Sequence, residues 1–389
     1  MIVLLFLLFG LYLPTSISGE FSKPLMGVDY ALCACLATWT IWKGNHASRI
    51  LFPIAMCIPS LILLFTVTSG FTTLTLWALL PYYVLSIVLL LRVKSLAISP
   101  RTEKLFMWAN VFNIALGFGM MFGVEAVQNF IGSHYAYIDS DFVAERMLSA
   151  HKPVITFYTH SIAGFMLYLF FYMNLRAFQV KQKKIYFWLS FGYLLLVLGM
   201  FSVTGIALFL LGSLQMFYVL WKTQRRFALT MVATCYLLFV GLNFVPLQEI
   251  AASMLENKES GLSGRYALDG TMYPAIQYLK AHPFNPVGAS IRGDIAFGDS
   301  GPLEYLLRGS LPLLILIYGL YFLFLKSNLK NRSDFWLLFL VTLGFEFGDT
   351  TLTYLRFLWL IPFVCVYLNH LQNGFKPDMQ IVGHGVSRI

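Results

Sequence analysis

Residues 302–325 read PLEYLLRGSLPLLILIYGLYFLFL, a stretch without any charged residue after Arg308. A bilayer core of about 30 Å needs about 20 apolar residues in one helix, so this stretch predicts a transmembrane helix. Glu304 and Arg308 lie near its beginning, one helical turn apart, which is the spacing of an intrahelical ion pair. Because Arg308 lies about 9 Å inside the helix, its charge has to face a partner or a cavity.

Segments of the same kind recur along the whole chain. The 389 residues are 58% hydrophobic and only 12% charged, and the mean hydropathy is +0.73, whereas soluble domains carry roughly 25% charged residues. This composition argues against a soluble Rossmann domain, a β-sandwich or a nucleic-acid-binding module. We predict an all-α polytopic membrane protein, with residues 1–389 as a single integral membrane domain of about twelve transmembrane helices. The predicted helical segments are 2–18, 24–42, 50–69, 71–91, 105–127, 153–175, 185–201, 203–221, 227–244, 302–325, 335–348 and 352–371.

The distribution of charged residues predicts how these helices are oriented. Most of the 27 lysines and arginines fall in alternate connections, and most of the 18 acidic residues fall in the others. Because basic connections remain on the cytoplasmic side, the N and C termini are both predicted to be cytoplasmic. Two outer connections are long, 128–152 between the fifth and sixth helices and 245–301 between the ninth and tenth. We therefore expect function on the extracytoplasmic face, under these two loops.

The second of these loops carries the motifs of the sequence. They are Ser263-Gly264-Arg265, His282-Pro283 followed by Gly288, and Asp299-Ser300-Gly301, with Gly309 in the next helix.

Between the first two motifs, the sequence predicts a short helix. Pro274 suits its first turn, and Asp269 or Thr271 could cap it. Its apolar face is expected to lie in the membrane interface. The sequence contains no Gly-rich phosphate loop and no His-Glu-x-x-His motif, so ATP-driven work and metalloprotease chemistry are not expected.

Together these motifs resemble those of the O-antigen polymerase and O-antigen ligase superfamily. Two further stretches are similar to this family, FSVTGIALFLL at 201–211 and KPVITFYTHS at 152–161. The ligase branch typically carries a His-Asn pair before the late helix, whereas this chain has Asp299-Ser300. That difference favours the polymerase branch.

The resemblance implies a glycosyltransferase of the bacterial inner membrane that needs no metal and no cofactor. Its donor and acceptor would be polyprenyl-diphosphate-linked oligosaccharides, joined at the periplasmic face with an inverting displacement. Membrane lipids, a chain-length regulator and a flippase are the other partners that it implies, and nucleic acid is not among them.

Such a reaction needs cations at the diphosphate and a base at the acceptor hydroxyl. Arginine suits the first role because it stays charged and binds phosphate oxygens in bidentate fashion. The candidate diphosphate-binding residues are Arg265, Arg292 and Arg308, with Arg146, Lys152 and Arg356 as possible supporting residues. The candidate catalytic residues are Asp299, Glu304 and, in reserve, His160.

Each candidate also has a structural interpretation. Arg265 could bind lipid phosphates, and Arg292 could pair with Asp294. Asp299 could do no more than stabilise the positive N-terminal end of a helix. His160 could be a core histidine. A mutual pairing is expected for the charged residues around the last outer turn, Glu346, Asp349 and Arg356.

Two other functions remain open at this stage. One is an O-antigen ligase that moves finished polymer to another acceptor. The other is a secondary transporter or flippase for lipid-linked glycans, since about twelve spans with both termini inside also fit a transporter. A transporter could tolerate the loss of Arg265 and Asp299, which a polymerase could not.

Overall fold

The chain is described by a computed structural model that covers residues 1–44, 46–69, 73–135, 147–157, 159–200, 202–225, 228, 266–268, 270–284, 286–289 and 300–373. Over these residues the structure is 77% helical, with 13 helices. The helices are α1 (Ile2–Tyr12), α2 (Lys23–Gly44), α3 (His46–Ser69), α4 (Thr73–Val88), α5 (Pro100–Met121), α6 (Glu125–His134), α8 (His160–Lys181), α9 (Lys184–Leu198), α10 (Val203–Thr223), α14 (Tyr273–Ala281), α15 (Gly301–Asn328), α16 (Arg332–Glu346) and α17 (Leu355–Asn373). Strands β1 (Ser16–Ile17) and β2 (Glu20–Phe21) form an antiparallel hairpin between α1 and α2.

The structure shows an all-α protein with several helices suited to a membrane. Among the residues that the structure describes, five helices, α2, α3, α8, α10 and α15, are long and apolar enough to cross a bilayer. A sixth span is possible if α5 and α6, bent by 111° against each other, are counted as one. Of the predicted segment 227–244, the structure describes only Ala228.

Two predicted segments are only partly helical. α1 ends at Tyr12, because Leu13 is extended and is followed by Pro14, so the prediction of a helix through residue 18 is wrong there. The chain forms the β1–β2 hairpin instead. α8 begins at His160, where the Thr159 side chain accepts a hydrogen bond from the Ile162 amide, so the described residues from 153 to 157 precede the helix.

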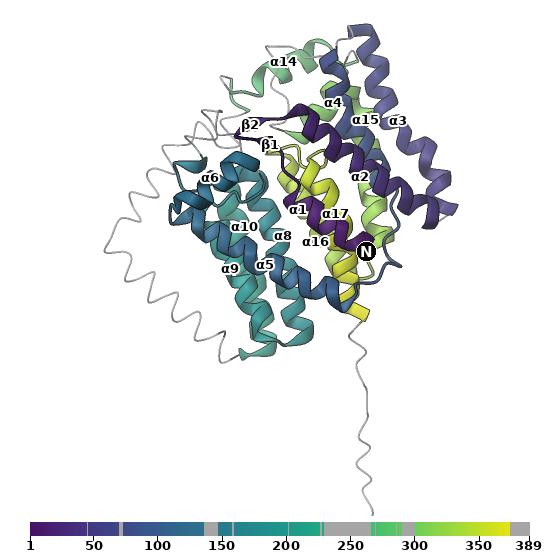
Figure 1. Cartoon of the computed structure of the whole chain (residues 1–389). Coiled ribbons are helices and arrows are strands. Elements are labelled where there is room, and N and C mark those ends of the chain that lie inside the picture. The colour runs from purple at the N-terminus through teal and green to yellow at the C-terminus, as the bar shows by residue number, and fades with distance from the viewer. Residues whose placement is uncertain are drawn as a thin grey trace, which may run out of the picture.

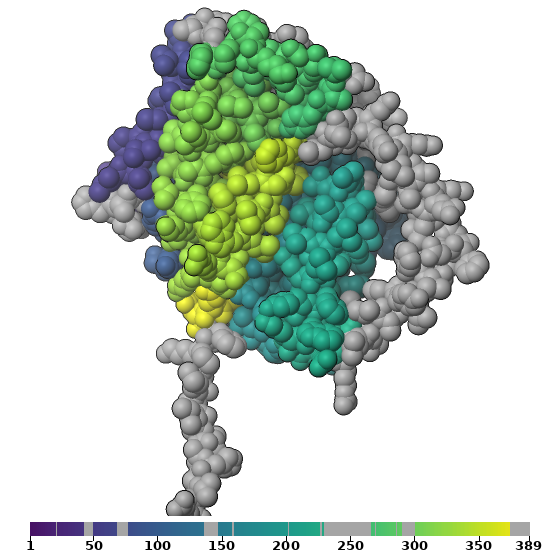
Figure 2. Space-filling model, turned by 180° about the vertical axis from the view of Figure 1, so that it is seen from behind, coloured from purple at the N-terminus to yellow at the C-terminus, as the bar shows by residue number. Residues whose placement is uncertain are grey.

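α17 forms the centre of the bundle (Figure 1). It is apolar on all sides, as a fully enclosed helix must be, and it contacts α1, α2, α4, α8 and α15. α5, α8, α9 and α10 lie on one side of it, and α2, α3, α4 and α15 lie on the other (Figure 1). Seen from behind, α15 and α16 lie side by side beneath α14 (Figure 2).

The outer faces of α2 and α3 keep large apolar side chains exposed. Trp42, Ile50, Leu64 and Val67 are each at least 60% exposed. Contiguous apolar surface of this kind suits contact with lipid chains.

Charged residues join the helices at the end of the bundle where α8 turns into α9 and where α17 ends (Figure 1). Asp334, fully buried on α16, pairs with Arg176 of α8 at 3.1 Å. It also accepts hydrogen bonds from Tyr172 at 2.5 Å and from Gln372 at 2.9 Å. Nearby, Glu103 of α5 pairs with Lys181. α14 and the β1–β2 hairpin lie at the opposite end (Figure 1).

Arg356, in the first turn of α17, caps the end of α1. The side chain is 1% exposed, and its Nη1 donates to the Phe9 carbonyl at 3.1 Å while Nη2 donates to the Leu13 carbonyl. The Phe9 carbonyl also accepts a hydrogen bond from the Leu13 amide at 3.3 Å, so the guanidinium adds a charged donor at the negative end of α1. Burial raises the pKa of Tyr135, opposed by the charge of Arg356 5.7 Å from its ring. The neutral phenol donates to the Tyr12 carbonyl at 2.9 Å.

We predict that Gly10→Ala loosens the α1–α17 contact. A Cβ on Gly10 would stand 2.8 Å from Trp359 Cβ, an atom that cannot move without its helix, and 2.9 Å from Leu360 Cγ. Overpacking of this kind costs roughly 1–3 kcal/mol. Thermal unfolding of the purified protein in detergent should show a lower Tm. Gly319→Ala is the matched control, because a Cβ there meets nothing within 4 Å, and an equal Tm for the two variants would contradict the prediction.

Candidate functional site

Glu304 and Arg308 form a buried ion pair in the first part of α15. Arg308 Nε lies 3.5 Å from Glu304 Oε1, and the two residues are 5% and 8% exposed, respectively. The prediction of an intrahelical pair is therefore confirmed. A pair removed from water in this way is stable only if its remaining hydrogen-bonding capacity is also used.

Three elements remote in sequence supply those hydrogen bonds. The Tyr82 hydroxyl of α4 donates to Glu304 Oε1 at 2.7 Å. Thr350, from the turn between α16 and α17, donates to Glu304 Oε2 at 3.0 Å. Arg308 Nη1 donates to the Gly288 carbonyl at 3.0 Å. The charged pair is thus the point where α4, α15, the α16–α17 turn and the segment 286–289 meet.

α15 is broken directly after Arg308. Gly309 and Ser310 leave the helical conformation, with φ of −157° and 62°. The break leaves the Leu307 carbonyl free to accept a hydrogen bond from the Val287 amide at 2.7 Å. The Ser310 hydroxyl donates to the Pro283 carbonyl at 3.2 Å. Non-helical backbone at a helix break needs such partners.

The segment that carries Gly288 is fixed against α3. Gly288 has a φ of +63°, and a Cβ added to it would lie 2.4 Å from the Thr66 nitrogen, so only glycine fits. The next amide, of Ala289, donates to Thr66 Oγ1 at 2.7 Å. The glycine of the His282-Pro283…Gly288 motif therefore orients the carbonyl that Arg308 binds.

The short helix predicted around Pro274 is present as α14. Pro274 occupies its first turn, and Met272 is its N-cap without a side-chain hydrogen bond, so the predicted cap at Thr271 is wrong. Asp269 lies outside the described residues. α14 packs on α15 through Ala275, which joins Val287 and Leu307 in a small apolar cluster. α14 thus covers the outer end of α15 (Figure 1).

A second carboxylate, Glu346, ends α16 close to the pair. It is fully buried, and its Oε1 accepts hydrogen bonds from the amides of Thr351 and Leu352 at 2.6 and 2.7 Å. The Tyr318 hydroxyl donates to its Oε2 at 3.3 Å. The expected pairing of Glu346 with Arg356 is wrong, because backbone amides of the α16–α17 turn take the place of the guanidinium.

Tyr266 also connects its segment to the end of α16 that carries Glu346. The Tyr266 hydroxyl, which follows the Ser263-Gly264-Arg265 motif in the sequence, lies 2.6 Å from Ser300 Oγ and 3.0 Å from the Phe347 carbonyl. Ser300 is the N-cap of α15. The first turn of α15 is therefore connected both to the end of α16 and to the segment after Arg265.

The other sequence-predicted site residues are distributed differently. His160 is the first residue of α8 and is half-buried. Lys152 is half-buried in the turns before that helix. α8 packs on α9, α10 and α17, whereas α15 packs mainly on α3, α14 and α16. Arg146, Arg265, Arg292 and Asp299 lie outside the described residues.

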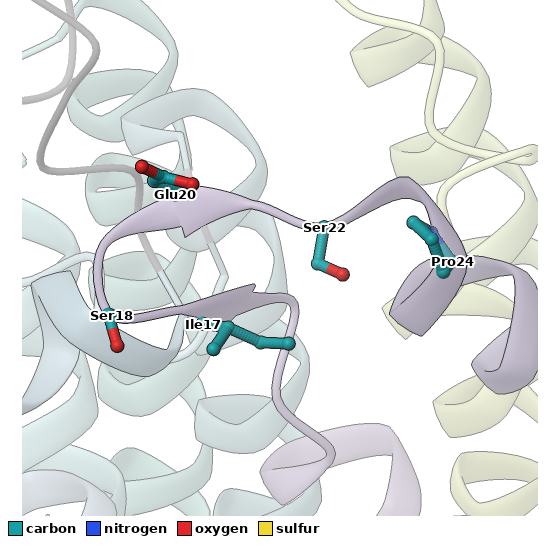
Figure 3. Close-up of a pocket in the computed structure, with 5 residues that line it drawn as sticks. All are labelled: Ile17, Ser18, Glu20, Ser22 and Pro24. Carbon is teal, nitrogen blue, oxygen red and sulfur yellow. The ribbon is translucent and has the colours of Figure 1, made fainter.

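A hollow of about 420 Å³ lies elsewhere, between the β1–β2 hairpin and the start of α2. In Figure 3, Ile17 and Pro24 face it from opposite sides, Ser22 points into it, and Glu20 points away. None of its lining residues belongs to the predicted site. Among the residues that the structure describes, no three His, Cys, Asp or Glu side chains are grouped to hold a metal ion.

Sequence reasoning missed Tyr82, Thr350 and Gly288 as partners of the ion pair. The sequence shows Gly288 only as part of a motif, and no sequence pattern indicates that Tyr82 or Thr350 contacts the ion pair. Comparisons with protein-family models, curated proteins and solved structures found no significant match to this chain.

We predict that Arg308→Met destabilises the protein strongly, because it leaves the Glu304 carboxylate buried without its cation. Removal of one partner from a buried pair costs about 3–5 kcal/mol. The double variant Glu304→Gln/Arg308→Met should recover most of this loss, since no charge then remains. Thermal unfolding of the native protein, the two single variants and the double variant in the same detergent measures the coupling between Glu304 and Arg308. Additive effects of the two changes would rule out the proposed interaction.

Proposed function

We propose that this chain is a polysaccharide polymerase that joins lipid-linked oligosaccharide repeats at the periplasmic face of a bacterial inner membrane. The observation that carries the proposal is the buried Glu304–Arg308 pair, held where the outer segment meets the bundle. An arginine and a carboxylate within 3.5 Å of each other combine a diphosphate ligand and a base in one place.

Each residue of the pair has a role in that reaction. The Arg308 guanidinium binds oxygens of the diphosphate on the donor and stabilises the charge that develops as it leaves. Glu304 accepts the proton of the acceptor hydroxyl while that oxygen attacks the anomeric carbon. The bond from this carbon to the diphosphate oxygen breaks, and the lipid diphosphate leaves with the electron pair. Inversion at the anomeric carbon is expected from such a single displacement.

The outer residues complete the site in this proposal. Arg265 and Arg292 contribute further positive charge to the diphosphate, and Asp299 is the second candidate for the base, with His160 in reserve. Arg146 and Lys152 remain supporting residues. Arg356 is engaged with two carbonyls of α1, which supports a structural role for it rather than contact with the substrate.

The arrangement of the bundle supports the proposed orientation. The N-terminal part of α15, which holds the Glu304–Arg308 pair, and α14 lie towards one end of the bundle, and the C-terminal end of α8, which carries Arg176 and Lys181, lies at the other (Figure 1). A topology of about twelve spans with both termini cytoplasmic places the basic end inside and the pair outside. The long segment 245–301 is then periplasmic.

A transporter or flippase is the second candidate, and the break in α15 favours it. Discontinuous helices with charged residues at the break line the substrate sites of many secondary transporters. The non-helical residues Gly309 and Ser310 directly follow the buried Arg308. A transporter would move lipid-linked repeats without joining them, so the products of the two functions differ.

We expect Arg308→Lys and Glu304→Gln to stop polymer formation in cells that lack the native gene. Loss of one charge-stabilising group typically costs about 10²–10³-fold in rate. Mass spectrometry of extracted lipid-linked glycans should then show single repeats on the polyprenyl carrier and no polymer. Gly319→Ala on the same helix should leave the profile unchanged.

Other outcomes of that experiment reassign the function. Long polymer that accumulates on the carrier would indicate a ligase. Single repeats confined to the cytoplasmic leaflet would indicate a flippase. A glycan profile unaffected by deletion of the gene would refute the polymerase proposal altogether.

A further inference from the structure

Glu346 has no place in the proposed chemistry, yet it accepts three hydrogen bonds, from the α16–α17 turn and from α15. Two amides and one phenol donate to its oxygens. Both amides belong to the turn between α16 and α17. After the last turn of a helix the following amides have no regular partner, so a carboxylate that takes two of them determines how the chain turns.

That turn carries one of the partners of Glu304. Thr350 directly precedes Thr351, whose amide is held 2.6 Å from Glu346 Oε1. The Thr350 hydroxyl in turn donates to Glu304 Oε2 at 3.0 Å. The position of one carboxylate is thus connected to the other through a single residue of backbone.

The second oxygen of Glu346 contacts α15 itself. A Cβ built on Gly301 would stand 1.9 Å from Glu346 Oε2, so the carboxylate lies directly against the backbone of the first turn of α15. Glu304 belongs to the same turn, and its amide donates to the Ser300 carbonyl at 2.9 Å. Tyr305, the next residue of α15, packs with its ring centroid 5.7 Å from that of Tyr318.

We propose that Glu346 is a positioning residue, which orients the Glu304 carboxylate by holding the α16–α17 turn on one side and the first turn of α15 on the other. Glu304 then presents Oε1 to Tyr82 and Arg308 while Thr350 occupies Oε2. Glu346 acts through its hydrogen bonds and its fit against Gly301, and its charge is not required. As far as catalysis is concerned, this inference rests on the proposed function.

The test compares Glu346→Gln with Glu346→Ala in the full-length protein. Glutamine keeps a carbonyl oxygen that can accept both amides, whereas alanine removes every acceptor. We expect the glutamine variant to keep nearly the native kcat. The alanine variant should lose about 10²-fold in kcat, the effect of displacing a catalytic group by about 1 Å. KM should change little, because the residue does not touch the substrate.

Asp334→Ala is the matched control for a purely structural effect. Asp334 is also fully buried on α16, but at the opposite end, where it pairs with Arg176. This variant should lower Tm at least as much as Glu346→Ala but keep nearly the native kcat. Equal losses of kcat in the two alanine variants would mean that Glu346 only stabilises the fold. A glutamine variant as inactive as the alanine variant would mean that the charge is needed, and would also overturn the proposal.

A glycine pair tests the same contact without removing the carboxylate. Gly301→Ala places a Cβ where Glu346 Oε2 lies, while Gly319→Ala on the same helix meets nothing within 4 Å. Gly301→Ala should reproduce the kcat loss of Glu346→Ala, and Gly319→Ala should be silent. Native kcat in Gly301→Ala would contradict the proposed fit.

Amide hydrogen exchange separates this inference from the proposed function. Exchange of the peptide around residues 350–354 should accelerate in Glu346→Ala and Gly301→Ala but not in Glu346→Gln or Gly319→Ala, whatever the protein catalyses. If the native protein makes no polymer, the proposed function fails and this exchange pattern still tests the positioning role. An unchanged exchange rate in Glu346→Ala would refute that role by itself.

Discussion

An unpaired charge is costly inside an apolar helix bundle, and this cost determines how the helices of this chain meet. Asp334 draws Arg176 of α8 and Gln372 of α17 to α16. Arg356 draws the carbonyl end of α1 to α17. Glu304 draws Tyr82 of α4 to α15. Apolar side chains pack in many registers, whereas each of these contacts has a fixed geometry, so the few charged residues specify which helices lie together and at which height.

The same requirement explains why the break in α15 and the ion pair occur together. A helix that stops at Gly309 leaves carbonyls without partners. One of them, the Leu307 carbonyl, accepts a hydrogen bond from the Val287 amide. That contact brings the neighbouring Gly288 carbonyl to Arg308. The broken backbone is thus satisfied by the segment that also completes the site, and a continuous helix would leave this segment without its anchor.

These long-range contacts mark the limit of what the sequence predicts. An apolar run signals a helix by itself, and a helix occurs in every predicted segment whose residues are described. The Glu304–Arg308 pair was also predictable, because one helical turn separates its members. Tyr82 lies 222 residues from Glu304 in sequence, and no local pattern connects them. Nearness along the chain predicts that Arg356 pairs with Glu346. The amides of the intervening turn bind Glu346 instead, and the carbonyls of α1 bind Arg356.

Glu304 and Glu346 differ in the nature of their hydrogen-bond partners, and this difference supports the roles proposed for them. The Oε1 of Glu346 accepts hydrogen bonds from two backbone amides of the α16–α17 turn, which hold it in place. Within the described part of the chain, the partners of the Glu304 carboxylate are side chains, two hydroxyls and a guanidinium, and the residue is 8% exposed. Hydroxyl donors can rotate away or donate elsewhere when a carboxylate gains a proton, whereas backbone amides of a tight turn cannot. In the proposed reaction Glu304, which lies beside Arg308, receives the proton of the incoming hydroxyl, and Glu346 holds Glu304 in position.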